Sequence, residues 1–322
     1  MLDNLLIFGG SGSPRLTSAI CHYLGQKVGN SEVLRFSEGN LFVRILENVR
    51  GRQVYLVQST AYPANDNFVE LLFWIDAFKR ASAASVTVVV PYFSYAKGDK
   101  KDEPRVSIRA RVCADAIQVA GADRIVTMDL HAPQIQGFFH IPVDDLQAMS
   151  VLCDAVKRKG LTDLIVVSPD TGFAKKARSY ASYLCTGLAI GDKERVDHNE
   201  CAEVLEIIGD VRGKTALIVD DFTISAGTLV EVAKKLIEYG AVAVYAAITH
   251  GVFAAGAMER IEDSPIVSLL VTDTIETVPT PLSPKIEVVS VAHLFGEAIR
   301  RIHDRESISV LFRDRGDERV AE

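Results

Sequence analysis

Two adjacent carboxylates, Asp220 and Asp221, stand at the end of an apolar run and are followed by small and hydroxyl residues. The stretch from Thr215 to Gly240, TALIVDDFTISAGTLVEVAKKLIEYG, predicts a strand, a short loop and an amphipathic helix. Amides in the first turn of a helix lack intrahelical partners, and the helix dipole attracts anions to them. Four small loop residues leave room for these amides to surround a phosphate: Ser225, Ala226, Gly227 and Thr228. Carboxylates repel phosphate but suit sugar hydroxyls or a bridging Mg²⁺, so the stretch predicts a sugar phosphate ligand.

A simpler interpretation of the same stretch is a turn followed by a helix N-cap, because Asp-Asp after a strand often has only that role. The pattern alone does not choose between the two interpretations. The sequence contains no G-x-x-x-x-G-K-[ST], which excludes a P-loop.

Lys193 and Arg195 lie two residues apart in the polar segment GDKERVDHNECAEV. Side chains at this spacing share one face of an extended chain, so a mobile loop could bring both cations onto a phosphoryl group during its transfer. On pattern alone, an ordinary flexible surface loop is the preferred interpretation of this segment.

His131 and Asp170 each follow a predicted strand, in the sequences DLHAPQ and SPDTG. Together they would make a site for phosphate-bound Mg²⁺, although histidine is not a preferred ligand of that hard ion. The alternatives are a structural histidine and a carboxylate that caps the following helix.

A second group of cations lies in the segment YAKGDKKDEPRVSIRARV, from Tyr95 to Val112. Such a charged run is usually a solvated loop. In an acidic protein it also creates a local field that suits a polyphosphate. The cations are Lys97, Lys100, Lys101, Arg105, Arg109 and Arg111.

Strand-like runs alternate with helical patterns along most of the chain. Strands are predicted at Leu5–Phe8, Val54–Gln58, Val86–Pro91, Arg124–Met128, Leu164–Val167, Thr215–Val219, Val242–Thr249 and Ile266–Val271. Helices are predicted at Asn67–Ala81, Arg109–Ala120 and Gly172–Leu184, and a tight turn is predicted before Pro14. The alternation predicts an α/β fold with mostly parallel sheets, whose ligands bind beyond the carboxyl ends of the strands. Two series of strands, separated near Val143–Asp154, predict two similar halves in tandem.

Composition limits the class of protein. A chain of 322 residues is long enough for two domains of about 150 residues each. A net charge of −7 argues against a partner that is a nucleic acid or a membrane surface. Five cysteines without a C-x-x-C pair indicate reduced thiols in a cytoplasmic protein. The N-terminus lacks the pattern of a signal peptide, and no apolar run reaches the length of a membrane span.

The motif DLHAPQIQGFFHIPVD resembles a signature of the ribose-phosphate diphosphokinases, also called phosphoribosyl pyrophosphate synthetases. The resemblance extends over almost the whole chain, through FSEGN, ENVRG, NDNFVEL, PYFSYA, SPDTG, DKER, IIGDV, VDDFTISAGTL, THGVF and ESISVLF. It implies transfer of the β,γ-pyrophosphoryl group of ATP to the anomeric hydroxyl of ribose 5-phosphate, with Mg²⁺. The products would be 5-phosphoribosyl 1-pyrophosphate and AMP.

The resemblance also implies two tandem type I phosphoribosyltransferase-like domains. Residues 1–146, joined by the C-terminal segment 303–322, would form the ATP side and the oligomer contacts. Residues 147–302 would form the ribose 5-phosphate side. In the commonest class of this family the members form hexamers assembled from dimers. The resemblance therefore implies that this chain forms a homo-oligomer built on a dimer. An anion site for phosphate or ADP is implied at Arg50, Gln136, Ser307, Ser309 and Phe312.

Roles for individual residues follow from the same resemblance. The implied ATP contacts are Phe36, Glu38, Asn40, Lys97, Asp99, Arg105 and His131, of which the first three would meet the adenine across a subunit boundary. Asp220 and Asp221 would hold the ribose hydroxyls, and residues 225–228 the 5-phosphate. The implied metal ligands are His131, Asp170, Asp220 and Asp221. The implied catalytic residues are Lys193, Arg195 and His131.

Several positions depart from the family pattern. Ile224 stands where the ribose 5-phosphate loop commonly has a third Asp, and Ser225-Ala226 replaces Thr-Gly. Glu38 and Asn40 replace Asp and Glu, and Lys97-Gly98 replaces Arg-Gln, which brings strict use of ATP into question. Ser107, Arg109 and Arg111 also differ from the family pattern, which brings the regulation of the protein into question.

These departures keep a second hypothesis open, a non-catalytic regulatory homologue that associates with an active synthetase. Against it, the six residues with implied chemical roles in transfer and metal binding are all present: His131, Asp170, Lys193, Arg195, Asp220 and Asp221. A third hypothesis, a phosphoribosyltransferase that consumes the product, would need neither the DLHAPQIQGFF motif nor two tandem halves.

Overall fold

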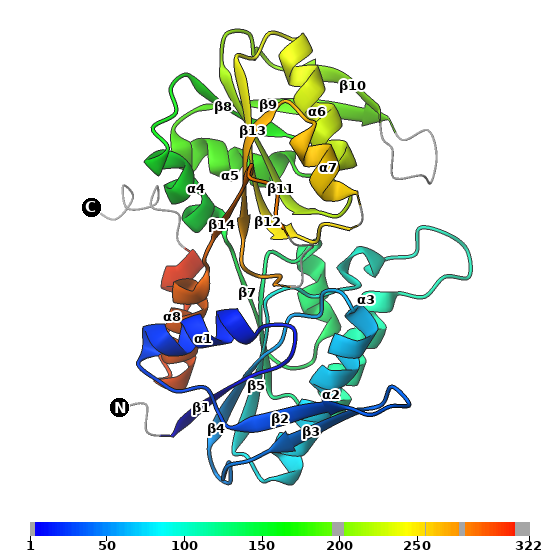
Figure 1. Ribbon diagram of the computed structural model, residues 1–322, viewed down its shortest axis with the longest axis vertical. Coiled ribbons are helices and arrows are strands. Elements are labelled where there is room, and N and C mark those ends of the chain that lie inside the picture. The colour runs from blue at the N-terminus through cyan, green and yellow to red at the C-terminus, as the bar shows by residue number, and fades with distance from the viewer. Residues whose placement is uncertain (1–3, 195–202, 255, 277–280, 313–322) are drawn as a thin grey trace. The chain divides into compact units, whose positions relative to one another are not determined.

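A computed structural model describes residues 4–194, 203–254, 256–276 and 281–312. The chain forms two compact units. The first takes in the described residues of Met1–Gln147, Thr274–Thr277 and Ser290–Phe312, and the second those of Ala148–Asp273 and Val278–Val289. Each unit is built around a sheet of its own (Figure 1).

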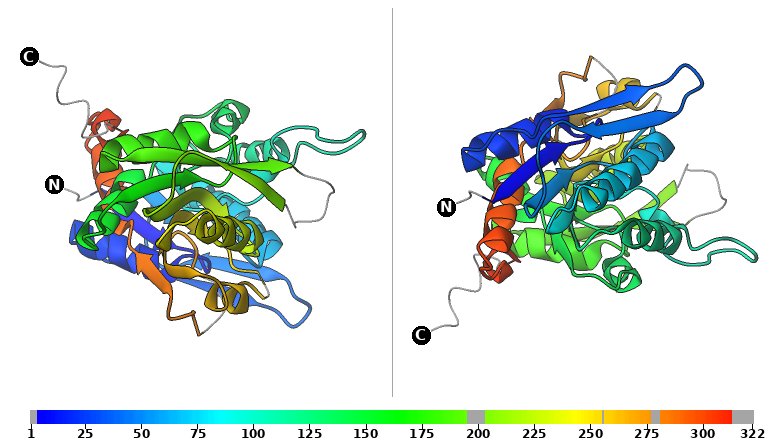
Figure 2. Two further views of the ribbon diagram at one scale, coloured as in Figure 1. Left: turned by 90° about the horizontal axis from the view of Figure 1, so that it is seen from above. Right: turned by 90° about the horizontal axis from the view of Figure 1, so that it is seen from below.

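The first unit has a parallel sheet in the order β1-β4-β5-β6-β7. Its strands are β1 (Leu5–Gly9), β4 (Gln53–Val57), β5 (Ser85–Val90), β6 (Arg124–Met128) and β7 (Val143–Leu146). An antiparallel hairpin of β2 (Ser31–Arg35) and β3 (Leu41–Ile45) lies against helix α2 (Figures 1 and 2). The helices are α1 (Pro14–Leu24), α2 (Ala64–Arg80), α3 (Arg109–Ala120) and α8 (Ala292–His303), with 3₁₀ turns η1 (Ala96–Gly98), η2 (Pro133–Phe138) and η3 (Ser309–Phe312).

The second unit has a sheet in the order β10-β9-β8-β11-β12-β13-β14, in which only the β9–β10 pair is antiparallel. Its strands are β8 (Leu164–Ser168), β9 (Gly187–Glu194), β10 (Glu203–Ile208), β11 (Thr215–Thr223), β12 (Ala243–Gly251), β13 (Ile266–Thr272) and β14 (Ile286–Val289). The helices are α4 (Met149–Arg158), α5 (Ala174–Leu184), α6 (Gly227–Glu238) and α7 (Ala257–Glu262).

The two units share one topology. When each antiparallel hairpin is set aside, the order β1-β4-β5-β6-β7 corresponds strand by strand to β8-β11-β12-β13-β14. In both units the hairpin follows the first of these strands in the chain. The predicted α/β fold with two tandem halves is therefore confirmed.

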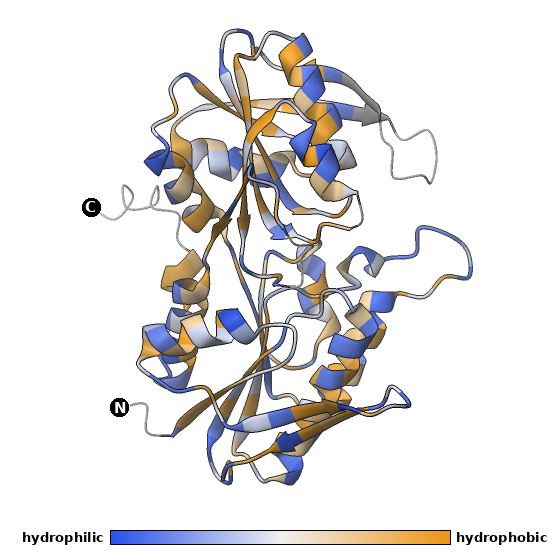
Figure 3. Ribbon diagram, in the orientation of Figure 1, coloured by the Kyte–Doolittle hydropathy of each residue, from blue (hydrophilic) through white to orange (hydrophobic). Residues whose placement is uncertain are grey.

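Each unit also has its own apolar core. In the first unit Trp74 stacks on Phe78, with ring centroids 5.4 Å apart, and Phe8 contacts Phe78 at 4.9 Å. In the second unit β-branched strand residues such as Ile218 and Val244 pack against buried positions of α6. Figure 3 shows the strands in mainly hydrophobic colours and the helices with mixed faces, the pattern expected of a sheet covered by amphipathic helices.

The chain returns to the first unit at Ser290, earlier than the predicted residue 303. The reason is helix α8, which packs against α1 within the first unit. A second returning segment carries Glu276, whose carboxylate accepts hydrogen bonds from the amides of Arg15 at 2.9 Å and Leu16 at 2.6 Å. Glu276 thereby caps α1, whose own N-cap residue Ser13 makes no side-chain cap bond.

Helix α8 carries a charged network centred on Glu297. Its carboxylate accepts hydrogen bonds from Arg300 at 2.9 Å and Arg301 at 2.6 Å, and these contacts lower the pKa of Glu297 to about 2. Because the folded-state pKa is depressed, the network stabilises the fold at pH values above about 4.5 and loses that contribution as the pH falls toward about 2.

We therefore expect Glu297→Gln to lower the free energy of unfolding by about 1–2 kcal/mol at pH 7, a value reduced for partial solvent screening. The difference from wild type should shrink as urea unfolding is repeated at pH values falling from 4.5 toward 2. Glu306→Gln is the matched control, since Glu306 also pairs with Arg300 but is 45% exposed and should change stability by less than about 0.5 kcal/mol. A difference for Glu297→Gln that persisted undiminished at low pH would contradict this account.

Two further features concern the thiols and the helices. Cys21, Cys113, Cys153 and Cys185 are free thiols. No helix in the described ranges has both the length and the apolar character needed to cross a membrane.

Candidate active site

Asp220 and Asp221 lie inside strand β11 and not in a loop after it. The strand was predicted to end at Val219, but parallel pairing with β12 continues through Asp220 opposite Ile248 to Thr223 opposite Gly251. Asp220 Oδ1 accepts the amide of Asp221 at 2.9 Å, and Asp221 Oδ1 accepts the amide of Phe222 at 2.9 Å. Both carboxylates are thus held close to the backbone at the carboxyl end of the strand.

The electrostatic setting of Asp220 is unfavourable to its charge. Burial is the largest influence raising the pKa of Asp220, followed by the negative charges of Asp221 and then of Asp170. Asp221 is itself only 6% exposed. The carboxylates of Asp220 and Asp221 on β11 and of Asp170 in the loop after β8 therefore repel one another. A divalent cation bound among them would reduce this repulsion.

Asp170 also has the structural role that was considered as its alternative. Its Oδ1 accepts the amide of Phe173 at 2.9 Å, at the start of helix α5, and Ser168 Oγ donates to the Asp170 carbonyl at 2.7 Å. One carboxylate oxygen therefore fixes the loop after β8. The electrostatic influence of Asp170 on Asp220 is a separate property of the same group.

The loop between β11 and α6 has the form expected of an anion cradle. Ala226 adopts the left-handed conformation, with φ 61° and ψ 5°, and α6 begins at the next residue without a side-chain cap. The carbonyls of Thr223 and Ile224 accept the amides of Val252 at 2.9 Å and Ala254 at 2.8 Å. The loop carbonyls are thus turned toward the segment after β12, which leaves the helix start for a ligand.

The segment of Lys193 and Arg195 differs from the surface loop favoured on pattern. The backbone of Lys193 belongs to strand β9, where it lies opposite Val204 of β10. Antiparallel pairing with β10 explains why this polar sequence is extended, since the pairing of β9 with β8 ends at Ile190. Arg195 lies outside the described residues.

In the first unit, the predicted ATP contacts come from two neighbouring loops. His131 is exposed and follows β6, two residues after Asp129, whose φ is 43°. Gln134 Nε2 donates to Asp99 Oδ2 at 3.2 Å, which joins the loop after β6 to the segment that contains Lys97. Lys97 lies in η1 and is exposed. Arg105 lies further along the same exposed segment, with a φ of 67°.

The remaining predicted ATP contacts lie at the tip of the β2–β3 hairpin. Phe36, Glu38 and Asn40 are all exposed. Asn40 Nδ2 donates to Glu38 Oε1 at 3.3 Å, and the ring of Phe36 lies 6.0 Å from that of Phe42. An aromatic ring and polar groups on a projecting tip suit contact with a ligand held by another copy of the chain.

Three of the residues predicted for an anion site, Gln136, Ser307 and Ser309, make local hydrogen bonds. The hydroxyls of Ser307 and Ser309 form a hydrogen bond of 2.7 Å, and Arg301 donates to the Ser307 carbonyl at 3.0 Å. Gln136 donates to the Pro133 carbonyl at 3.1 Å. Arg50 and Phe312 are exposed. The assembly of these residues into one site stays a prediction.

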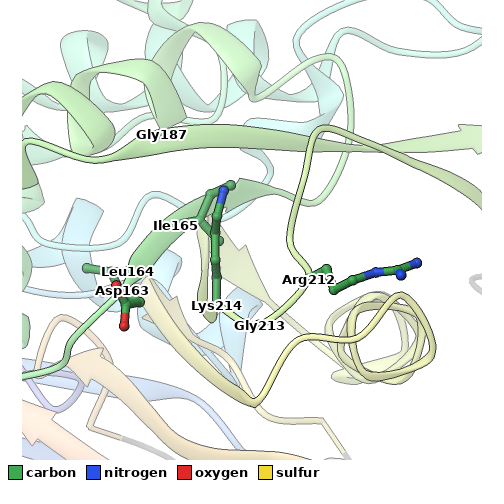
Figure 4. A pocket seen from close by; sticks show the side chains of 7 residues that line it. All are labelled: Asp163, Leu164, Ile165, Gly187, Arg212, Gly213 and Lys214. Carbon is green, nitrogen blue, oxygen red and sulfur yellow. The ribbon is translucent and has the colours of Figure 1, made fainter.

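A cavity of about 390 Å³ in the second unit lies away from the candidate site. Its wall comes from residues at the starts of β8 and β9 and from the turn before β11: Asp163, Leu164, Ile165, Gly187, Arg212, Gly213 and Lys214 (Figure 4). Lys214 donates to the Asp210 carbonyl at 2.8 Å. Ligands of open α/β sheets bind at the opposite, carboxyl ends of the strands, so this cavity has no part in the chemistry discussed below.

Comparison with known proteins shows which family has this arrangement. Residues 5–121 match the N-terminal domain of ribose phosphate pyrophosphokinase, and residues 199–313 match the phosphoribosyl synthetase-associated domain. A ribose-phosphate pyrophosphokinase of Caldanaerobacter subterraneus subsp. tengcongensis is 51% identical over 311 residues, which cover 96% of this chain and 98% of that protein. The chain belongs to the ribose-phosphate pyrophosphokinase family.

Other relatives of the ribose-phosphate pyrophosphokinase family agree over the same length. The ribose-phosphate pyrophosphokinase of Oceanobacillus iheyensis is 46% identical, over 96% of this chain and 98% of that protein. The crystal structure of phosphoribosylpyrophosphate synthetase from Mycobacterium smegmatis matches with a TM-score of 0.88 and 36% identity, over 94% of this chain and all of that one. The family membership and the fold predicted from the motifs are both confirmed.

Proposed function

We propose that this protein is a ribose-phosphate diphosphokinase that makes 5-phosphoribosyl 1-pyrophosphate and AMP from ribose 5-phosphate and ATP. The observation that carries the proposal is the end of β11, where two carboxylates precede an uncapped helix start in the left-handed turn at Ala226. Such a site offers carboxylates that can accept hydrogen bonds from sugar hydroxyls and, a few residues away, amides that can donate hydrogen bonds to a phosphate. A sugar phosphate needs both. Relatives named for this activity, at 45–51% identity, support the same conclusion.

In the proposed reaction the C1 hydroxyl oxygen of ribose 5-phosphate attacks the β-phosphorus of ATP. The bond between that phosphorus and the oxygen bridging to the α-phosphorus breaks, AMP leaves with that oxygen, and the C1 hydroxyl releases its proton. Asp220 and Asp221 would hold the ribose hydroxyls, while the amides of residues 225–228 and the Ser225 and Thr228 hydroxyls would hold the 5-phosphate. The chain's contribution is placement and charge neutralisation, because phosphoryl transfer needs little covalent help.

Lys193 and Arg195 would neutralise charge on the transferring group. His131, Lys97, Asp99 and Arg105 would bind ATP in the first unit, and the hairpin tip with Phe36, Glu38 and Asn40 would meet the adenine of a neighbouring copy. A homo-oligomer built on a dimer is therefore part of the proposal. So is a cytoplasmic location, where ATP is available and free thiols persist.

The acidic end of β11 fits Mg²⁺. Carboxylate oxygens are the protein ligands that this ion prefers, and the raised pKa of Asp220 reflects, besides its burial, the negative charge that gathers there. Within the described residues, no three His, Cys, Asp or Glu side chains are already arranged around a metal position. We propose Asp170, Asp220 and Asp221 as ligands in the second unit and His131 as a ligand in the first unit, with substrate oxygens completing each coordination. When bound, the ion neutralises phosphate charge.

The test is AMP release from ATP by the purified protein, with ribose 5-phosphate and Mg²⁺ each added or omitted. We expect AMP only when both are present, together with a product that carries pyrophosphate on C1. Ribose without its 5-phosphate is the matched control and should not support the reaction. Failure to form AMP from ATP and from other nucleotides, with folded protein and inorganic phosphate present, would favour the regulatory homologue suggested by Ile224.

A further inference from the structure

Three consecutive carbonyls at the end of β11 and in the loop that follows accept hydrogen bonds from the part of the chain after β12. The carbonyls of Thr223 and Ile224 accept backbone amides from the segment after β12, as described above. The third carbonyl, that of Ser225, accepts a hydrogen bond at 3.0 Å from a side chain, the guanidinium of Arg260. Nothing in the local sequence GAMERIED distinguishes this arginine from an ordinary surface charge.

Arg260 is well suited to act on this loop. It lies on the short helix α7, which packs against α6, and its residue is exposed. Among the described residues its guanidinium forms no ion pair, although Glu259 and Glu262 are neighbours in the helix. Its positive charge therefore remains available beside the loop that would hold the 5-phosphate.

The hydrogen bond fixes a particular peptide. The Ser225 carbonyl belongs to the planar peptide that continues to the amide of Ala226, and in a trans peptide the carbonyl and the N–H point in opposite directions. When Arg260 holds the carbonyl toward α7, the Ala226 amide must point away from α7. Ala226 is 1% exposed and left-handed, a conformation that residues other than Gly and Asn disfavour.

We infer that Arg260 is a positioning residue for a phosphate monoester. It holds the Ser225–Ala226 peptide in the strained orientation that aims the loop amides at the phosphate, and it adds positive charge beside them. This inference rests on the proposed function, because it assigns the phosphate of ribose 5-phosphate as the group that the loop receives. It also explains how the loop keeps its shape with Ala at a position that favours Gly.

The test compares Arg260→Gln with wild type and with Arg212→Gln, a control that removes an exposed charge at the other end of the same sheet. We expect Arg260→Gln to raise the KM for ribose 5-phosphate and its Kd by calorimetry about tenfold, the usual effect of one hydrogen bond to a charged group. The KM for ATP should change less than about twofold, and Arg212→Gln should change neither.

Testing Arg260→Gln in a second variant, Ala226→Gly, distinguishes a positioning role of Arg260 from a general contribution to the stability of the fold. In Ala226→Gly the left-handed turn no longer costs strain, so adding Arg260→Gln should weaken ribose 5-phosphate binding by only about threefold or less. Arg260→Lys, which keeps the charge, gives a second folded variant and should fall between Gln and wild type. Equal rises in KM for both substrates, an unchanged Kd, or a full tenfold loss in the Gly background would each overturn the inference. Absence of any AMP formation by wild type would instead count against the proposed function, while the calorimetric comparison would still decide the role of Arg260.

Discussion

Lys193→Ala should lower kcat by about 10²–10³-fold while the KM values for ATP and ribose 5-phosphate change little. The reason is that a cation which acts on the transferring phosphoryl group interacts more strongly with the transition state than with bound substrates. The measurement is steady-state AMP release with each substrate varied in turn.

The position of Lys193 makes this a sharp test. Its backbone is paired within β9, so the substitution leaves the strand's hydrogen bonds in place. Lys234→Ala is the matched control, because Lys234 is an exposed lysine on α6 of the same unit, where it pairs with Glu231 at 3.3 Å. A loss that appeared in KM and not in kcat would assign Lys193 to substrate binding, and equal losses in both lysine variants would remove its special role.

Asp220→Asn should have opposite effects on activity and on stability. Binding of ribose 5-phosphate should weaken about a hundredfold, since a half-buried charged acceptor of hydrogen bonds from the sugar hydroxyls is lost. The unliganded protein should gain on the order of 1 kcal/mol in its free energy of unfolding at pH 7. The measurements are calorimetric binding and urea unfolding of the same preparations.

The sign of the stability effect follows from the pKa of Asp220, which burial, Asp221 and Asp170 raise. A raised folded-state pKa means that the folded protein binds this proton more tightly than the unfolded chain. The favourable contribution of Asp220 to the free energy of unfolding is therefore present at low pH. It is lost as the pH rises above the ordinary pKa range of an Asp. The gain from Asn should disappear at low pH, where Asp220 is neutral.

Glu231→Gln is the control for this second experiment, because Glu231 is an exposed carboxylate of the same unit, 50% exposed on α6. It should change neither binding nor stability appreciably. A loss of stability in Asp220→Asn at pH 7 would show that hydrogen bonds of the ionised carboxylate outweigh its repulsion from Asp170 and Asp221.

Periodicity predicted the elements that depend on local pattern. The strands before His131 and Asp170, the helix Arg109–Ala120 and the turn before Pro14 are all present close to their predicted limits. Buried parallel strands are continuous apolar runs, and their ends are marked by polar or small residues, so the signal lies within a few neighbouring positions. The family was equally accessible, because its motifs are short and contiguous.

Features that depend on distant partners were not predictable in this way. The polar end of strand β9 was interpreted as a loop because its residues are extended through pairing with β10, which follows later in the chain. The extension of β11 through both carboxylates needs β12 beside it. Helix α8 joins the first unit through α1, and Glu276 caps a helix about 260 residues before it in the chain.

The sequence by itself determined the residue types at the site: two carboxylates, a small-residue loop and the cations that suit a sugar phosphate. Only the tertiary structure decided how those groups are held. The pKa of Asp220 is raised first by burial, then by Asp221 and also by Asp170 from another strand end, and the direction of the Ser225 carbonyl depends on an arginine 35 positions further along the chain. Local pattern cannot encode such contacts, because electrostatic and hydrogen-bond partners are selected by proximity in space and not by separation in sequence.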